Sequence, residues 1–120
     1  MLTPEELKAY ASGWKRRSQE KQRKRDILRG EAMGRAYLVA RLLREKYGVK
    51  RVILFGSLAE GMVRDGSDID LVAEGLDMDR FIDIYWDASQ LAHPFELDLV
   101  PLESATGPLL RRIQKSGVEI

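Results

Sequence analysis

Two aspartates separated by one residue are the first feature of this sequence that could do chemistry. Asp68 and Asp70 stand in a stretch that alternates polar and apolar residues with the period of a strand. In a strand, residues i and i+2 project to the same side, so the two carboxylates should lie close together. Like charges at such proximity raise each other's pKa unless a cation lies between them. The pair therefore indicates a bound metal or a shared proton.

A third carboxylate is available on a second alternating stretch. Asp98, preceded by Glu96, lies in residues 95–100. If this strand pairs beside the first, Asp98 completes a cluster of three carboxylates. The chain has no cysteine, which excludes disulfides, thiolate zinc sites and thiol nucleophiles. Oxygen ligands of this kind suit Mg²⁺, which is commonly held by a few carboxylates together with water and substrate phosphates.

Gly56 and Ser57 offer a place for those phosphates. They follow directly on the apolar run 52–55. A glycine at the end of a buried strand lets backbone N–H groups approach a ligand closely, and a following helical turn presents its positive end. Ser57 can add a hydroxyl donor. A triphosphate here, with metal at Asp68 and Asp70, is the arrangement needed for in-line nucleotidyl transfer.

The elements that must position these residues follow from hydrophobic periodicity. We expect strands over 51–55, 69–74 and 95–100, with a helical turn at 57–61 between the first two. An amphipathic helix is predicted from 78 to 92, and a last helix over roughly 106–116 should bury Leu109, Leu110 and Ile113 and end at Gly117. The apolar face of the 78–92 helix is predicted to consist of Met78, Phe81, Ile82, Tyr85 and Ala92. The fold class is α/β (α+β), a small mixed sheet with helices packed against it.

A long basic helical region precedes this core. Thr3, Pro4 and Glu6 form a helix-start pattern, with Thr3 as N-cap and Glu6 completing a capping box. Good helix formers continue to Lys46, which predicts one long helix or two consecutive helices with any break near Gly30, and the end at Gly48. We therefore divide the chain into a basic extension, 1–30, and a core domain, 31–120. In the second part of this region the core-facing residues should be Met33, Ala36, Tyr37, Ala40, Leu43 and Tyr47.

Charge is distributed unevenly along the chain. The whole chain has a net charge of +1, but residues 15–29 hold eight Lys/Arg against Glu20 and Asp26. Residues 15–26 have almost no apolar stripe, which is typical of a solvated helix or of an arm that docks elsewhere. Such an arm could hold nucleic acid, through residues 14–29 with Trp14 stacking on a base, or an acidic partner. A solvated face and an apolar anchor role for Trp14 remain equally open.

Composition sets further bounds. With 120 residues, 44% hydrophobic and 32% charged, the chain fits one small globular domain. No apolar run approaches the ~20 residues of a membrane span, and the N-terminus lacks the order of a signal peptide. We therefore expect a cytoplasmic protein with no membrane contact.

Residues 54–72, LFGSLAEGMVRDGSDIDLV, resemble the signature of the minimal nucleotidyltransferases of the DNA polymerase beta-like superfamily. FELDLV, residues 95–100, is similar to the family's third-carboxylate strand, and the C-terminal PLLRRIQKSGVEI is similar to the close of these small proteins. The resemblance covers about residues 31–120. It implies a polymerase beta-like core of the MntA-like antitoxin type.

The resemblance also implies roles for particular residues. Nucleotide binding falls to Gly56, Ser57, Arg64 and Ser67. Asp68, Asp70 and Asp98 become the catalytic metal ligands of a two-metal Mg²⁺ site, with ATP as the usual donor. The small family members resemble antitoxins encoded beside a helical HEPN partner, which implies transfer of AMP to a tyrosine of that partner. A HEPN-type protein or a homodimer would complete the acceptor site.

One departure from the family pattern keeps an alternative open. Arginines that often help to bind triphosphate are replaced here by Leu58 and Glu60. The alternative is a catalytically weak protein- or RNA-binding module that neutralises a partner by binding it.

Overall fold

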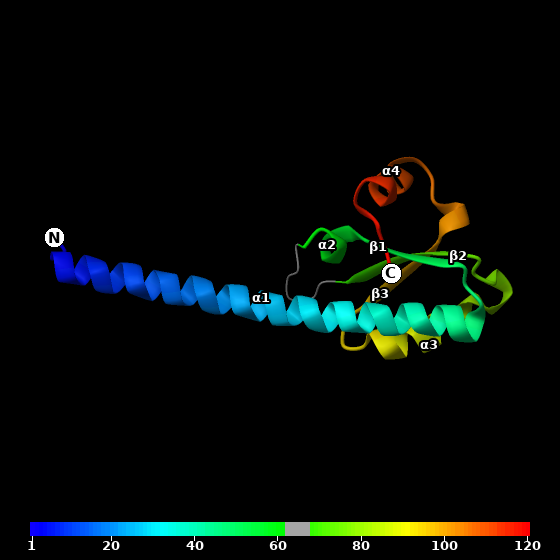
Figure 1. Cartoon of the computed structure of the whole chain (residues 1–120), viewed down its shortest axis with the longest axis horizontal. Coiled ribbons are helices and arrows are strands. Elements are labelled where there is room, and N and C mark those ends of the chain that lie inside the picture. Colours follow the sequence, from blue (N-terminus) through cyan, green and yellow to red (C-terminus); the bar gives the residue numbers. More distant parts are fainter. Residues whose placement is uncertain (62–67) are drawn as a thin grey trace.

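The computed structural model describes residues 1–61 and 68–120, which form a small mixed sheet beside one very long helix (Figure 1). The helices are α1 (Pro4–Tyr47), α2 (Gly56–Ala59), α3 (Phe81–Ala92) and α4 (Gly107–Ser116). The strands are β1 (Arg51–Phe55), β2 (Ile69–Glu74), β3 (Leu97–Pro101) and β4 (Val118–Glu119). Short 3₁₀ turns, η1 (Met78–Arg80) and η2 (Leu102–Ser104), precede α3 and follow β3. The predicted α+β class is confirmed.

The long helix α1 begins and ends as the sequence predicts. Thr3 accepts a hydrogen bond from the Glu6 backbone N–H, and the Glu6 side chain accepts one from the Thr3 backbone N–H, so the capping box is present. Gly48 ends the helix in the left-handed conformation, with φ of 67°. Of the two alternatives for this region the structure has one long helix, because α1 runs unbroken over 44 residues and does not break near Gly30. A single glycine inside a helix costs only about 1 kcal/mol, which its good helix-forming neighbours tolerate.

The sheet has the order β3-β2-β1-β4. β1 is antiparallel to both β2 and β4, while β2 and β3 run parallel. The parallel pair places Asp70 opposite Asp98, and the β1–β2 pair places Phe55 opposite Asp70. The strand β4 at the C-terminal end was not predicted. The mixed sheet is confirmed.

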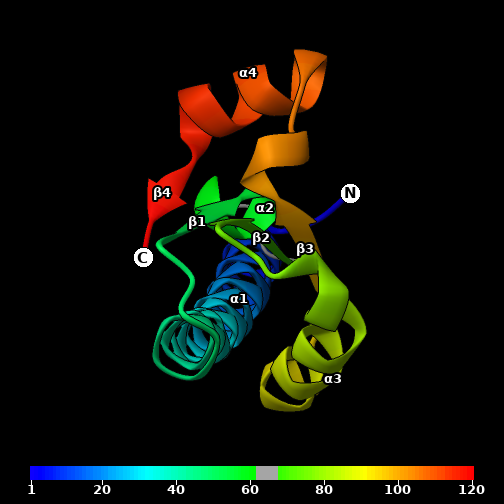
Figure 2. The ribbon, with the colours of Figure 1, turned by 90° about the vertical axis from the view of Figure 1, so that its right-hand side faces the viewer.

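Helices cover both faces of the sheet (Figure 2). On one face α1 and α3 enclose the larger core, which includes Leu43, Leu54, Leu71 and Ile84, each fully or almost fully buried. On the other face α4 covers a smaller core of Ile53, Phe55, Val72, Ala105 and Ile113. Strand residues therefore alternate between two apolar layers, as a strand buried on both sides requires.

Two predicted helix faces need correction. On α3 the buried residues are Ile84, Ala88 and Ala92, whereas Met78, Ile82 and Tyr85 are exposed. The small alanines let α3 pack closely on the core, and the larger side chains are left outside. On α1 the predicted face holds at Ala36, Ala40 and Leu43, but Tyr37 is exposed.

No helix among the described residues is both long and apolar enough to cross a membrane.

Candidate active site at the Gly56 turn

The carboxylates of Asp70 and Asp98 lie on the same face of the sheet. Ile69 and Leu71 belong to the larger core, so the side chain of Asp70, which lies between them, projects to the opposite face, toward α4. Leu97 and Leu99 place Asp98 in the same way. The strand pairing on which the prediction for Asp98 depends is present, because Asp70 and Asp98 are direct partners in parallel strands.

Asp68 lies just outside β2, and its side chain is exposed. It is nevertheless close enough to act electrostatically on Asp70. Burial raises the pKa of the Asp70 carboxyl above its usual value of 3.8, and the negative charges of Asp98 and Asp68 raise it further. The three carboxylates thus repel one another, and a cation among them would relieve this repulsion.

Gly56 connects β1 to α2 and contacts this cluster directly. Its φ of 76° is a left-handed conformation that side chains rarely adopt. A Cβ atom placed on Gly56 would overlap the carboxylate of Asp70. The position therefore needs glycine for two independent reasons, and the second ties the turn to the carboxylate. Ser57 follows in the first turn of α2 and is partly exposed.

The predicted nucleotide contacts Arg64 and Ser67 lie outside the described residues. Leu58 and Glu60 lie in different environments. Leu58 is fully buried in the larger core, so this position serves packing. Glu60 is exposed and faces α4, where it accepts a hydrogen bond of 3.1 Å from the Ser116 hydroxyl.

Arg112 of α4 is a cation at this site that we did not assign to it from the sequence. Its Nε lies 3.7 Å from the Glu60 Oε1 atom, and its positive charge lowers the pKa of Asp70, opposing the three effects described above. In the sequence, Arg112 stands among the basic residues near the end of a predicted helix, where a cation suits the helix dipole. Only the docking of α4 over the sheet brings it to Asp70.

The residues present have the chemistry of a Mg²⁺ site, because they offer hard oxygen donors whose mutual repulsion raises a pKa. Within residues 1–61 and 68–120, however, no three carboxylate or histidine side chains converge closely enough to form a ready-made metal site. Two of the three carboxylates are in register, and the third stands at the edge of the described part of the chain.

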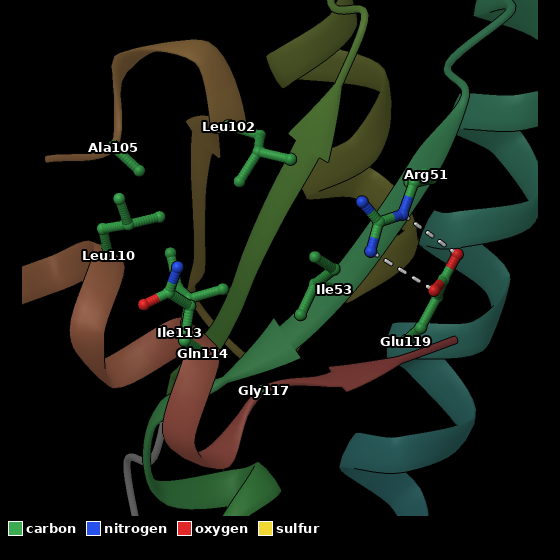
Figure 3. Close-up of a pocket in the computed structure, with 9 residues that line it drawn as sticks. All are labelled: Arg51, Ile53, Leu102, Ala105, Leu110, Ile113, Gln114, Gly117 and Glu119. Atoms are coloured by element: carbon green, nitrogen blue, oxygen red, sulfur yellow. Dashed lines mark hydrogen bonds and ion pairs between the residues drawn. The ribbon is translucent and has the colours of Figure 1, made fainter.

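A separate cavity of about 550 Å³ lies between α4, η2 and the sheet (Figure 3). An ion pair between Arg51 and Glu119, 3.3 Å from Nε to Oε1, closes one side. Its floor is apolar and includes Ile53 and Ile113, and none of the predicted site residues lines it. It occupies the Arg51 end of β1, whereas the carboxylates lie at the Phe55 end.

The sheet order, the glycine turn and the paired carboxylates together define a nucleotidyltransferase fold. Residues 39–120 match the family described as polymerase beta, nucleotidyltransferase. This match covers more than half of the sequence, and the chain belongs to that family. No curated protein matches it significantly.

Several solved structures are similar, among them chains of toxin–antitoxin complexes. A toxin–antitoxin structure with AMP-PNP is 27% identical, covers 70% of each chain and has a TM-score of 0.56. A mutant MntA-HpeT complex is 26% identical over 70% of this chain and 69% of that one, with a TM-score of 0.58. A tri-AMPylated Shewanella oneidensis HEPN toxin in complex with MNT antitoxin gives 25% identity, 73% and 70% coverage and a TM-score of 0.51. These matches support a minimal nucleotidyltransferase domain of the antitoxin type.

Proposed function

We propose that this chain transfers the AMP moiety of ATP to a hydroxyl group, the tyrosine hydroxyl of a HEPN-type partner protein, with pyrophosphate as the leaving group, and acts as the antitoxin of a toxin–antitoxin pair. The observation that carries the proposal is the register of Asp70 with Asp98 beside the Gly56 turn. Two similarities support the chemistry. One related complex contains AMP-PNP, and another contains an AMPylated HEPN toxin with an MNT antitoxin.

In this proposal each part of the site has a task. Backbone N–H groups at Gly56 and the hydroxyl of Ser57 bind the triphosphate, together with Arg64 and Ser67 from the segment outside the described residues. Asp68, Asp70 and Asp98 would hold Mg²⁺, which neutralises charge on the phosphates and favours loss of a proton from the acceptor hydroxyl. The raised pKa of Asp70 reflects a carboxylate that a cation would stabilise in its ionised form.

Arg112 takes a further part in the proposal. The loop cations common in the family are replaced by Leu58 and Glu60, and Arg112 brings a positive charge to the same region from α4. Its ion-pair partner Glu60 is exposed, so little free energy is lost when Arg112 leaves this carboxylate to bind an incoming phosphate. We therefore assign Arg112 to the binding of the triphosphate.

The test is transfer of label from ATP to the partner. The chain is incubated with Mg²⁺, ATP labelled in the AMP moiety and a HEPN-type protein, and labelled protein is measured. We expect Asp70→Asn to abolish labelling and Asp83→Asn, which changes an exposed aspartate of α3 away from the site, to leave it intact. Equal labelling by the two variants would refute the proposal.

A binding-only antitoxin is the alternative. It predicts a stable complex with the partner that survives Asp70→Asn, no heat of Mg-ATP binding in calorimetry and no labelled product. If a homodimer supplies the acceptor surface, the labelling assay should label the chain itself and not the partner protein.

A further inference from the structure

The first 30 residues form an arm that extends clear of the folded body (Figure 1). All but Gly13 and Leu28 are exposed, and the first buried residue of α1 is Ala32. The long dimension of the molecule is 69 Å, against 30 and 18 Å for the other two. Helical residues rise ~1.5 Å each, so the helical part of the arm is about 40 Å long.

The middle of the arm has a composition that restricts its partner. Residues 15–26 contain no apolar side chain. A helix that packs on another helix needs an apolar seam, and a helix that lies on a membrane needs an apolar face. Neither is present over these twelve residues. A partner that binds here must be recognised through charge and hydrogen bonds.

Four of the cations form a row that slants gradually around one side of the helix, and we call Arg17, Lys21, Arg25 and Arg29 the cation row. They recur every four residues, so successive members lie one above another, ~6 Å apart along the axis. Like charges at this spacing repel one another. Within the described residues none of the four makes an ion pair. The carboxylate of Asp26 instead accepts a hydrogen bond of 2.9 Å from Gln22.

Exposed aromatic rings continue the cation row toward the N-terminus. Trp14 is 59% exposed and Tyr10 63%, and their spacing of three and four residues places them on the same side of the helix as Arg17. The Arg17 guanidinium lies over the Trp14 ring, with Cζ 5.5 Å from the ring centroid. Proteins bind single-stranded nucleic acid by combining positive charge that follows the backbone with aromatic rings on which bases stack.

We propose that the arm binds a single strand of nucleic acid, with the phosphates along the cation row and a base stacked on Trp14. This site is distinct from the nucleotidyltransferase site and lies on the opposite end of α1 from the sheet. RNA and DNA share the phosphodiester chemistry that the row recognises, and the experiment separates them. An acidic protein would also satisfy the charge, but it would leave the aromatic rings without a role.

The experiment uses the full chain carrying Trp86→Phe, which leaves Trp14 as its sole tryptophan because the sequence contains two. Fluorescent 20-nucleotide strands of uridine and of thymidine, a DNA duplex and poly-glutamate are titrated over a series of salt concentrations. The row variant is Lys21→Gln/Arg25→Gln. The matched control is Arg16→Gln/Arg23→Gln, which removes the same charge from the opposite side of the helix.

Four phosphate contacts to a single strand predict that log affinity falls with log salt concentration with a slope of about −2.8. The row variant should reduce the steepness of the slope by about 1.4, and the control by much less. Binding should also quench Trp14 fluorescence. The tighter of the two strands identifies RNA or DNA as the ligand.

Three results would overturn the proposal. The first is the absence of saturable strand binding at low salt. The second is an equal loss of affinity in the row variant and its control, which would indicate a diffuse charge effect. The third is binding of poly-glutamate or of the duplex as tightly as the strands without quenching of Trp14, which would assign the arm to another class of partner.

Discussion

Gly56→Ala isolates the contact between the Gly56 turn and the Asp70 carboxylate, because the chain contains a matched control. Gly56 and Gly61 have nearly the same left-handed backbone, with φ of 76° and 78°. A Cβ on Gly56 would overlap the Asp70 carboxylate, whereas a Cβ on Gly61 would meet no atom of the described residues within 4 Å. The two alanine substitutions therefore share the backbone cost and differ in the contact with Asp70.

The magnitudes follow from these two components. An alanine held in the left-handed region costs ~1–2 kcal/mol. Gly61→Ala should lose that amount, a fall of roughly 4–8 °C in the midpoint of thermal unfolding. Gly56→Ala adds a steric overlap, which typically costs a further ~1–3 kcal/mol. If the turn or the carboxylate moves by about 1 Å to relieve it, transfer should fall about 100-fold.

The assay measures both quantities on the same preparations. Thermal unfolding gives the stability difference, and transfer of labelled AMP at a temperature where both variants are folded gives the activity. We expect Gly61→Ala to lose stability and retain transfer, and Gly56→Ala to lose both. Equal transfer by the two variants would refute the inference that the Gly56 turn and Asp70 form one unit.

Three further predictions concern charges. Arg112→Ala should weaken ATP binding about threefold in calorimetry, and it should change the free energy of unfolding by less than ~0.5 kcal/mol because the ion pair of Arg112 with Glu60 is exposed. The control is the neighbouring substitution Arg111→Ala. Equal ATP affinity of the two variants would exclude a role for Arg112. The raised pKa of Asp70 means that the folded chain holds this proton more tightly than the unfolded chain, so the contribution of Asp70 to metal-free stability should be fully present below pH ~3.8 and be lost as pH rises through the raised pKa. Asp70→Asn should lack this contribution in urea unfolding across pH. The pKa of Asp87 shifts in the opposite direction, because hydrogen bonds from Lys46 and Tyr47 lower it. The stability that Asp87 contributes is present above pH ~3.8 and is lost as pH falls through the lowered pKa. An Asp87→Asn variant whose stability has the wild-type pH dependence would contradict this prediction.

Local patterns predicted the strands well because each strand is bounded by strong signals. β1 lies between Gly48 and Gly56, and the alternation after Asp68 fixed β2 at 69–74. The pairing of Asp70 with Asp98 was predicted only as a condition, because the order and direction of strands depend on how α3 crosses between them. In the parallel pair of β2 and β3, the observed register places Asp70 directly beside Asp98.

The errors arise where tertiary packing overrides local pattern. The predicted face of α3 is correct at Ala92, but Ile84 and Ala88 are buried in place of Ile82, which is left outside. Arg112 was not assigned to the site, because its position depends on where α4 docks. No residue pattern indicates β4, a two-residue strand whose existence depends on the neighbouring edge of β1.

The elongated shape affects how the oligomeric state should be measured. The radius of gyration is 19.2 Å, whereas a compact chain of this length would have one of about 14 Å. A compact protein with the observed radius would contain roughly 300 residues. A monomer should therefore elute from a sizing column among globular proteins of more than twice its mass. Early elution would then not indicate self-association, and methods that measure mass directly, such as light scattering or sedimentation equilibrium, are needed to test for a homodimer.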